Sequence, residues 1–238
     1  MKRTNIFKAA SSRFLRPRLF DGYSPFELVE AVKERYHFNE VPTARQLSTH
    51  PRPTRPASFI YGKMEAEDRL IRVEQFLVRS LVPHATLLTA STRTSTKEAD
   101  MFLNDLLTWA KEKYDLDTSP AFPAAYESQL AVTFDPSFGG SEVFTMLGQG
   151  ITGLVRGYGF KDCHAFELVE VSMRCEGAQL EQYRACPFSL KRQVAPLSNE
   201  YQYFSQAPLR TTDHERLLAE LERVVLGLQV PRIELMEE

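Results

Sequence analysis

Two spacings of hydrophobic residues predict which parts of the chain are helices and which are strands. A period near 3.6 runs through residues 25–36, residues 96–114 and the stretch from Thr212 to Pro231. At the start of each stretch lies a Ser or Thr that is followed three residues later by Glu, the pattern of a capping box. These residues are Ser24, Ser95 and Thr212. We therefore expect three helices.

Other segments show strand patterns. In YESQLAVTF, Leu130, Val132 and Phe134 fall on one face and Glu127 and Gln129 on the other, as in a half-buried strand. Further segments are rich in β-branched and aromatic residues. The six segments expected to be strands are 58–65, 68–80, 84–93, 126–134, 163–175 and 183–194.

Taken in order, these elements indicate an α+β fold. Strands that follow one another directly usually pair antiparallel, so we expect a largely antiparallel sheet of about six strands covered by helices. The sequence shows no internal repeat.

The first 57 residues differ from the rest. Phe7, Ala10 and Phe14 have helical spacing before Pro17, which predicts a short amphipathic segment. Residues 41–58 contain four prolines and three arginines and no acid, which favours an extended strap. We therefore divide the chain into an extended basic N-terminal arm with a short helix, residues 1–57, and an α+β body, residues 58–238.

Charge supports this division and suggests a function. Residues 1–56 carry 11 Lys and Arg against 5 Asp and Glu, whereas the remainder carries 18 against 26. A basic arm can dock on the acidic body of a neighbouring subunit, so we expect a non-enzymatic assembly subunit, a homo-oligomer or part of a larger protein complex. The residues expected to make this contact are Arg13, Arg16, Arg18, Arg45, Arg52, Arg55, Phe7 and Phe14.

Three alternatives stay open. The arm could bind nucleic-acid phosphates, or it could fold onto its own acidic body. The chain could also be an enzyme whose site is assembled from residues far apart in the sequence. Nucleic-acid binding would weaken steeply with salt, whereas an enzyme would show a pocket in which polar groups converge.

No local motif predicts catalytic, cofactor-binding or metal-binding residues. In CHAFELVEVSMRC the strand alternation would hold Cys163 and Cys175 roughly 40 Å apart, too far to share a metal ion. Gly148, Gly150 and Gly153 match G-x-G-x-x-G, but the chain lacks the βαβ pattern of a dinucleotide-binding fold. The three cysteines, an odd number, are expected to be reduced thiols.

The expected location is the cytoplasm, without membrane contact. The amino terminus lacks the apolar core of a secretory signal, and no apolar run approaches the roughly 20 residues of a transmembrane helix. An uncharged stretch of 13 residues lies between Glu142 and Arg156. Its mixture of small and large residues favours close packing against a helix or another subunit.

Overall fold

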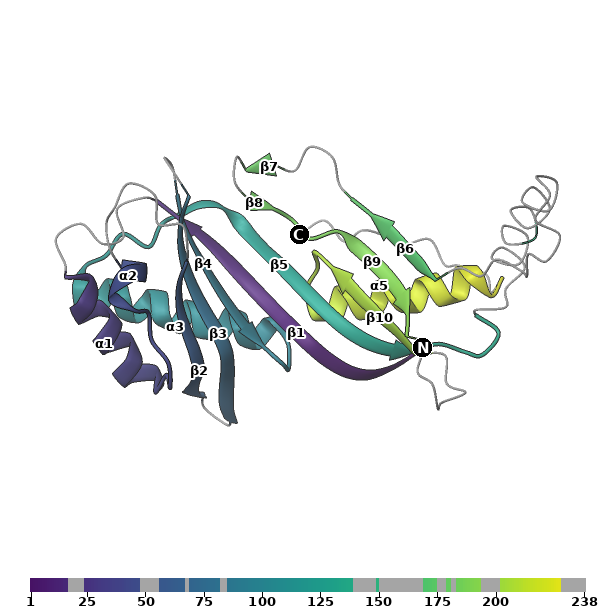
Figure 1. The fold of residues 1–238 in the computed structure, drawn as a ribbon, viewed down its shortest axis with the longest axis horizontal. Helices are drawn as coiled ribbons and strands as arrows, with labels where there is room; N and C mark the ends of the chain where they lie inside the picture. The colour runs from purple at the N-terminus through teal and green to yellow at the C-terminus, as the bar shows by residue number, and fades with distance from the viewer. Residues whose placement is uncertain are drawn as a thin grey trace.

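An eight-stranded antiparallel sheet organises the chain in the computed structural model (Figure 1). The strand order is β2-β3-β4-β1-β5-β10-β9-β6, and a separate pair is formed by β7 and β8. The α+β prediction is therefore confirmed, with more strands than expected. The structure describes residues 1–16, 24–47, 56–66, 69–81, 85–138, 149, 169–174, 179–180, 183–193 and 202–227.

The start of the chain lies at the centre of this sheet. Strand β1 (Lys2–Leu15) pairs with β4 (Ala85–Thr92) on one side and with β5 (Pro120–Thr133) on the other. The extended arm expected from the sequence is therefore wrong for residues 2–15, because these residues belong to the body. Helix α1 (Pro25–Tyr36) lies where the pattern predicted it, and α2 (Ala44–Leu47) is a short turn of helix within the proline-rich stretch.

Irregular pairing explains why the hydrophobic spacing in the first strand resembles that of an amphipathic helix. Its register with β5 shifts between Arg3 and Asn5 and again between Ile6 and Lys8, and at each place β1 has one residue more than β5. Each bulge inserts a residue and resets the alternation of faces. Hydrophobic residues in β1 consequently fall at spacings of three and four, which imitate a helical period.

Most of the other predicted elements are confirmed. Helix α3 has the predicted bounds, and α5 begins one residue before the expected Thr212. The predicted strand at 163–175 is described only from residue 169 to residue 174. The single strand predicted at 183–194 is wrong, because the structure divides it into β8 and β9, which belong to different sheets, and β10 was not predicted. The bounds are β2 Ala57–Ala66, β3 Arg69–Leu81, α3 Thr96–Tyr114, β6 Glu170–Met173, β7 Gln179–Leu180, β8 Tyr183–Arg184, β9 Phe188–Arg192, β10 Gln202–Ala207 and α5 Thr211–Val225.

The topology repeats although the sequence does not. From the centre outward, the strand order is β1, β4, β3, β2 in the first half and β5, β10, β9, β6 in the second. In each half the second strand from the centre, β4 or β10, is followed after a three-residue connection by a long helix, α3 or α5. The two halves are thus related by an approximate two-fold axis between β1 and β5.

Aromatic side chains fill the core of the first half. Phe102 on α3 lies 4.8 Å from the ring of Tyr36 and 5.5 Å from that of Phe76, measured between ring centroids. Tyr36 donates a hydrogen bond to Asp105 at 2.7 Å, which satisfies its otherwise buried hydroxyl. Gly62 leaves room for the ring of Phe38, since a Cβ at that position would lie 2.4 Å from it.

The second half has a smaller core beneath α5. Leu218 is fully buried against Leu130, Val132 and Leu190. Helices α3 and α5 both lie behind the sheet in Figure 1, and α1 packs on the same side through Tyr36 and Phe102. Among the described elements no helix covers the opposite face of the sheet, which we call the open face.

Candidate functional site

The residues assigned to the arm do not form one surface. Arg13 lies under the sheet, where its guanidinium is 2.7 Å from Oδ1 of Asp100 on α3. Phe14 is buried and meets Phe122 edge to face, with ring centroids 6.0 Å apart. Arg16 and Phe7 are exposed. Arg45 lies in α2, whereas Arg18, Arg52 and Arg55 lie outside the described residues.

A histidine and two serines form the arrangement most like an enzyme site. Ser128 Oγ lies 2.7 Å from Nδ1 of His214, and Ser205 Oγ lies 2.8 Å from Nε2. Ser205 donates its own proton to the carbonyl of Ser189, so Nε2–H donates to Ser205 and Ser128 donates to Nδ1. All ring nitrogens are satisfied with the imidazole neutral.

Burial makes this network structural. His214, Ser128 and Ser205 have no solvent-exposed surface, and burial lowers the pKa of His214 from 6.5 to about 4. A substrate would reach the hydroxyls only if α5 separated from the sheet. The arrangement therefore ties α5 to β5 and β10.

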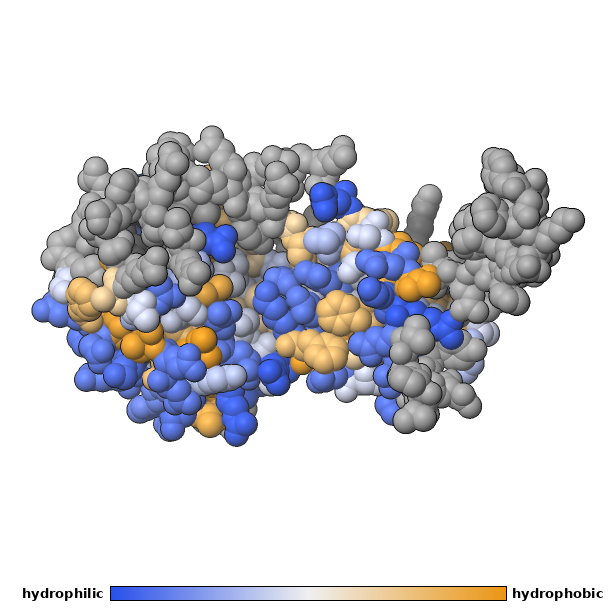
Figure 2. Space-filling model, in the orientation of Figure 1, coloured by the Kyte–Doolittle hydropathy of each residue, from blue (hydrophilic) through white to orange (hydrophobic). Residues whose placement is uncertain are grey.

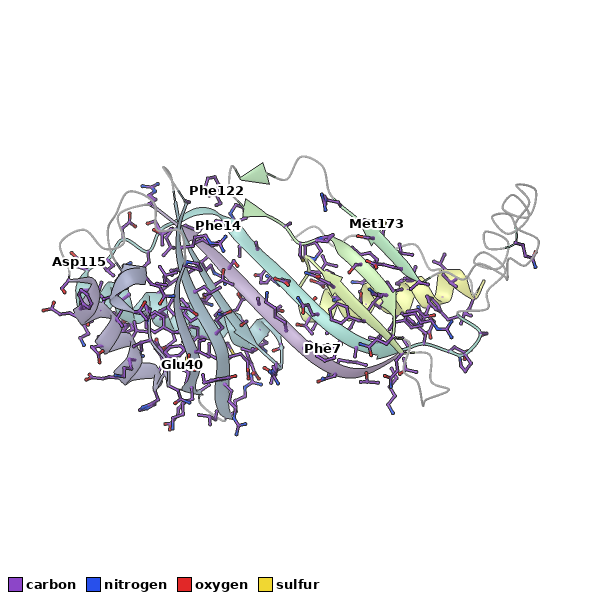
Figure 3. The ribbon with its side chains drawn as sticks, in the orientation of Figure 1. Phe7, Phe14, Glu40, Asp115, Phe122 and Met173 are labelled. Atoms are coloured by element: carbon purple, nitrogen blue, oxygen red, sulfur yellow. The ribbon has the colours of Figure 1, made fainter. Side chains whose placement is uncertain are left out.

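The open face carries a patch of interacting side chains around the centre of the sheet. The bulge between Ile6 and Lys8 places both Phe7 and Lys8 on this face, although they are neighbours in the chain. Phe7 is 44% exposed, and its ring centroid lies 5.8 Å from that of Phe204 on β10. In Figures 2 and 3 an apolar spot at the position of Phe7 is surrounded by hydrophilic side chains.

Glu127 is the hub of the polar part of this patch. Its Oε2 accepts from Lys8 Nζ at 2.7 Å, and its Oε1 accepts from Gln129 at 2.7 Å and from Gln206 at 3.2 Å. A second ion pair joins Lys191 on β9 to Glu170 on β6 at 3.8 Å. The open-face patch therefore consists of Phe7, Lys8, Glu127, Gln129, Glu170, Lys191, Phe204 and Gln206.

A half-buried thiol borders the patch. Burial and the neighbouring charge of Glu127 raise the pKa of Cys186 to about 11. The thiol is thus protonated at neutral pH, which is the opposite of the lowered pKa of a nucleophilic cysteine. Cys186 therefore packs at the border of the patch and is a poor nucleophile.

The described residues offer no metal site. No group of three or more His, Cys, Asp and Glu side chains comes together among them. Glu65 is exposed on β2. Its neighbours Glu67 and Asp68 lie outside the described residues, as do His84, Cys163 and Cys175. The glycine-rich segment is likewise outside, apart from Gln149.

Part of the patch was foreseeable from the sequence. The alternation in residues 126–134 placed Glu127 and Gln129 on one face, but nothing near them in the sequence named their partners. Phe204 and Gln206 were missed with their strand. The ring of Phe7 is exposed, and its role as a contact residue stays a prediction.

Within the described part of the chain, no helix is both long enough and apolar enough to cross a membrane. A comparison of the sequence and the structure with protein families, curated proteins and solved structures found no match.

Proposed function

We propose that the chain is a non-enzymatic assembly subunit that associates with copies of itself through the open-face patch. This keeps the function expected from the sequence and moves the contact from an arm to the sheet. The observation that carries the proposal is the exposed ring of Phe7, which packs against the half-buried ring of Phe204 and is framed by polar groups on a face that no described helix covers. An aromatic centre with a polar rim is typical of protein interfaces.

The charges favour a protein partner over a nucleic acid. Lys8 and Lys191 are the basic residues of the patch, and each is already paired with a carboxylate. A surface that binds phosphates needs unneutralised positive charge. A patch that holds both signs can instead be self-complementary, because a two-fold axis brings the lysine of one copy to the glutamate of the next.

The buried network argues against the enzyme alternative. Among the described residues, the histidine that meets two serine hydroxyls is closed off from solvent and neutral. Its geometry serves packing between α5 and the sheet. The proposal therefore rests on surface chemistry.

Light scattering on the full-length protein tests this function. We expect a mass above the 27.2 kDa of one chain that rises with concentration, and a return to one chain in Phe7→Asp. Phe26→Asp is the matched control, because Phe26 is also an exposed phenylalanine but lies on α1. A wild-type protein that stays monomeric at high concentration would contradict the proposal. Absorbance at 260 nm on the same peak would reveal bound nucleic acid.

A further inference from the structure

The charged residues of the open-face patch follow a regular order across the sheet. From the centre of the sheet to the edge at β6, the strand order is β1, β5, β10, β9, β6 (Figure 1). Lys8 on β1 is paired with Glu127 on β5, and Lys191 on β9 is paired with Glu170 on β6. Strand β10, with the sequence QYFSQA, lies between the two pairs and contains no charge. The order of charges is therefore positive, negative, neutral, positive, negative.

This order makes the patch complementary to a second copy of itself. If two copies face each other with β10 opposite β10, β1 of each lies opposite β6 of the other, and β5 lies opposite β9. Lys8 then faces Glu170 of the second copy, and Glu127 faces Lys191 of the second copy. The strands of both sheets are about 4.8 Å apart, so these pairs come together at the same time. All four contacts, two of each kind, join opposite charges.

The positions of the charges along the strands also allow these contacts. The ion pair of β9 and β6 lies in the row of paired residues that contains Phe204 on β10. The ion pair of β1 and β5 lies beside Gln206, whose amide donates to Oε1 of Glu127 at 3.2 Å. The two ion pairs therefore differ by roughly 7 Å along the strand direction. The long, flexible side chains of lysine and glutamate span this difference.

The charges also decide the direction of a two-fold axis between the copies. An axis that runs along β10 produces the facing just described. An axis across the strands would place each strand opposite itself, so Lys8 would face Lys8 and Glu127 would face Glu127. A side chain on the axis meets its own counterpart, which an uncharged side chain tolerates and a charged one does not. Phe204 and Gln206 take this position, and the ring centroid of Phe7 lies 5.8 Å from that of Phe204.

All four charged side chains are accessible to a second copy. Their exposed fractions are 37% for Lys8, 23% for Glu127, 58% for Lys191 and 47% for Glu170. Ion pairs with this exposure contribute little to the stability of one chain. In a dimer each carboxylate would gain a second ammonium neighbour, so the same charges would instead select the partner and its orientation.

We propose that two copies pack open face against open face, with a two-fold axis along β10. This inference rests on the proposed function, because it requires the open-face patch to join copies of the chain. The rings of Phe7 and Phe204 from both copies form the centre of the contact, and four ion pairs between the copies flank it. Aligned packing of two twisted sheets is the arrangement found in β-sandwiches.

Two variants that swap the charges within an ion pair test this arrangement. The edge-swap variant combines Lys191→Glu with Glu170→Lys, and the centre-swap variant combines Lys8→Glu with Glu127→Lys. Each keeps an ion pair inside the chain, so the melting temperature should stay close to that of the wild type. Each also makes the charge order symmetric, so like charges would meet in its homodimer. Sedimentation velocity should show that the dissociation constant of either homodimer rises at least about tenfold.

The two variants should associate with each other. Facing copies of the edge-swap and centre-swap variants bring opposite charges together at all four positions, so an equimolar mixture should dimerise about as tightly as the wild type. Combining all four substitutions in one chain restores the alternating order and should restore the homodimer. These two recoveries would show that dissociation of the single swap variants is not a loss of folding.

Cross-linking locates the axis. In a chain whose three native cysteines are replaced by serine, Gln206→Cys lies on the axis. Ser172→Cys lies two strands away in the same row, because Gln206 pairs with Ser189 and Ser189 pairs with Ser172. A short bis-maleimide should link two copies of the first variant and not two copies of the second.

The outcomes separate this inference from the proposed function. A wild-type protein that stays monomeric would overturn both. A wild-type dimer that Phe7→Asp dissociates, combined with swap variants that self-associate as tightly as the wild type, would overturn the axis along β10 and leave the proposed function in place. Cross-linking of Ser172→Cys in preference to Gln206→Cys would do the same.

Discussion

Thr96 and Thr211 cap each other's helix across the centre of the molecule. The backbone N–H of Thr96 donates to Oγ1 of Thr211 at 3.0 Å, and the N–H of Thr211 donates to Oγ1 of Thr96 at the same distance. Each residue is the first of its helix, so the starts of α3 and α5 meet near the approximate two-fold axis. Free N–H groups at a helix start need a partner, and here each half supplies it to the other.

This reciprocal contact should couple the two halves energetically. Thr96→Val and Thr211→Val each remove a buried acceptor, and we expect each to cost about 1–2 kcal/mol of unfolding free energy. The double variant should cost less than the sum by about 1 kcal/mol, because both bonds serve one contact. Urea denaturation of the four proteins measures this, with Thr96→Ser as the control that keeps the hydroxyl. Strictly additive losses would show that the halves are independent.

The buried histidine should make stability depend on pH. Its pKa is lowered from 6.5 to about 4, so below pH 6.5 the unfolded chain binds a proton that the folded chain does not. The contribution of neutral His214 to the free energy of unfolding is therefore complete above pH 6.5 and is lost as the pH falls toward 4. We expect the free energy of unfolding to fall by about 2–3 kcal/mol between pH 7 and pH 4.5, as measured by chemical denaturation. In His214→Gln this pH dependence should disappear, and an unchanged slope would contradict the assignment.

Gly62 should not tolerate even a methyl group. A Cβ there would lie 2.4 Å from the ring of Phe38, which is itself packed against Phe59 and Phe76. We expect Gly62→Ala to cost about 1–3 kcal/mol by overpacking. The cost should shrink when Phe38→Leu is combined with it, whereas Lys63→Ala on the exposed face of β2 should change stability by less than about 0.5 kcal/mol. Thermal melts of these variants provide the comparison.

The thiol beside the patch should react slowly. In a Cys163→Ser, Cys175→Ser background Cys186 is the sole cysteine, and its pKa of about 11 leaves little thiolate at pH 7.5. We expect its rate with a disulfide reagent to be roughly 100-fold below that of an unperturbed thiol and to rise steadily with pH. Glu127→Gln removes a neighbouring negative charge and should accelerate the reaction. A fast reaction at neutral pH would show that the thiol is neither buried nor near that charge.

The two helices with the longest regular apolar stripes were predictable because one local period determines them. In α3 the capping serine, the stripe and the end of the pattern agree, and Ser95 Oγ indeed accepts from the backbone of Glu98 at 3.2 Å. Strands β1 and β10 were missed for specific reasons. Bulges disrupt the period of β1. In β10 the buried face carries the polar Ser205, which binds His214, and the open face carries the apolar Phe204. At these two positions the usual pattern of apolar residues on the buried face and polar residues on the exposed face is reversed.

The candidate sites were harder to predict than the fold because their parts come from distant strands. Lys8 and Glu127 are far apart in the sequence, and only the register of β1 with β5 brings them to 2.7 Å. The sequence shows that residues 1–16 are basic, but it does not show which partners their positive charges have. Arg13 neutralises Asp100 inside the molecule and leaves no charge for a partner.

The central position of β1 also affects how the chain can fold during synthesis. Its pairing with β4 can form once the first half is made, but Leu15 pairs with Pro120 and Lys2 with Thr133, which emerge much later. Until then one side of β1 is a temporary edge whose backbone groups have no partner. A half-made chain therefore offers a template for strand pairing with other chains, and the second half completes the fold by closing that edge.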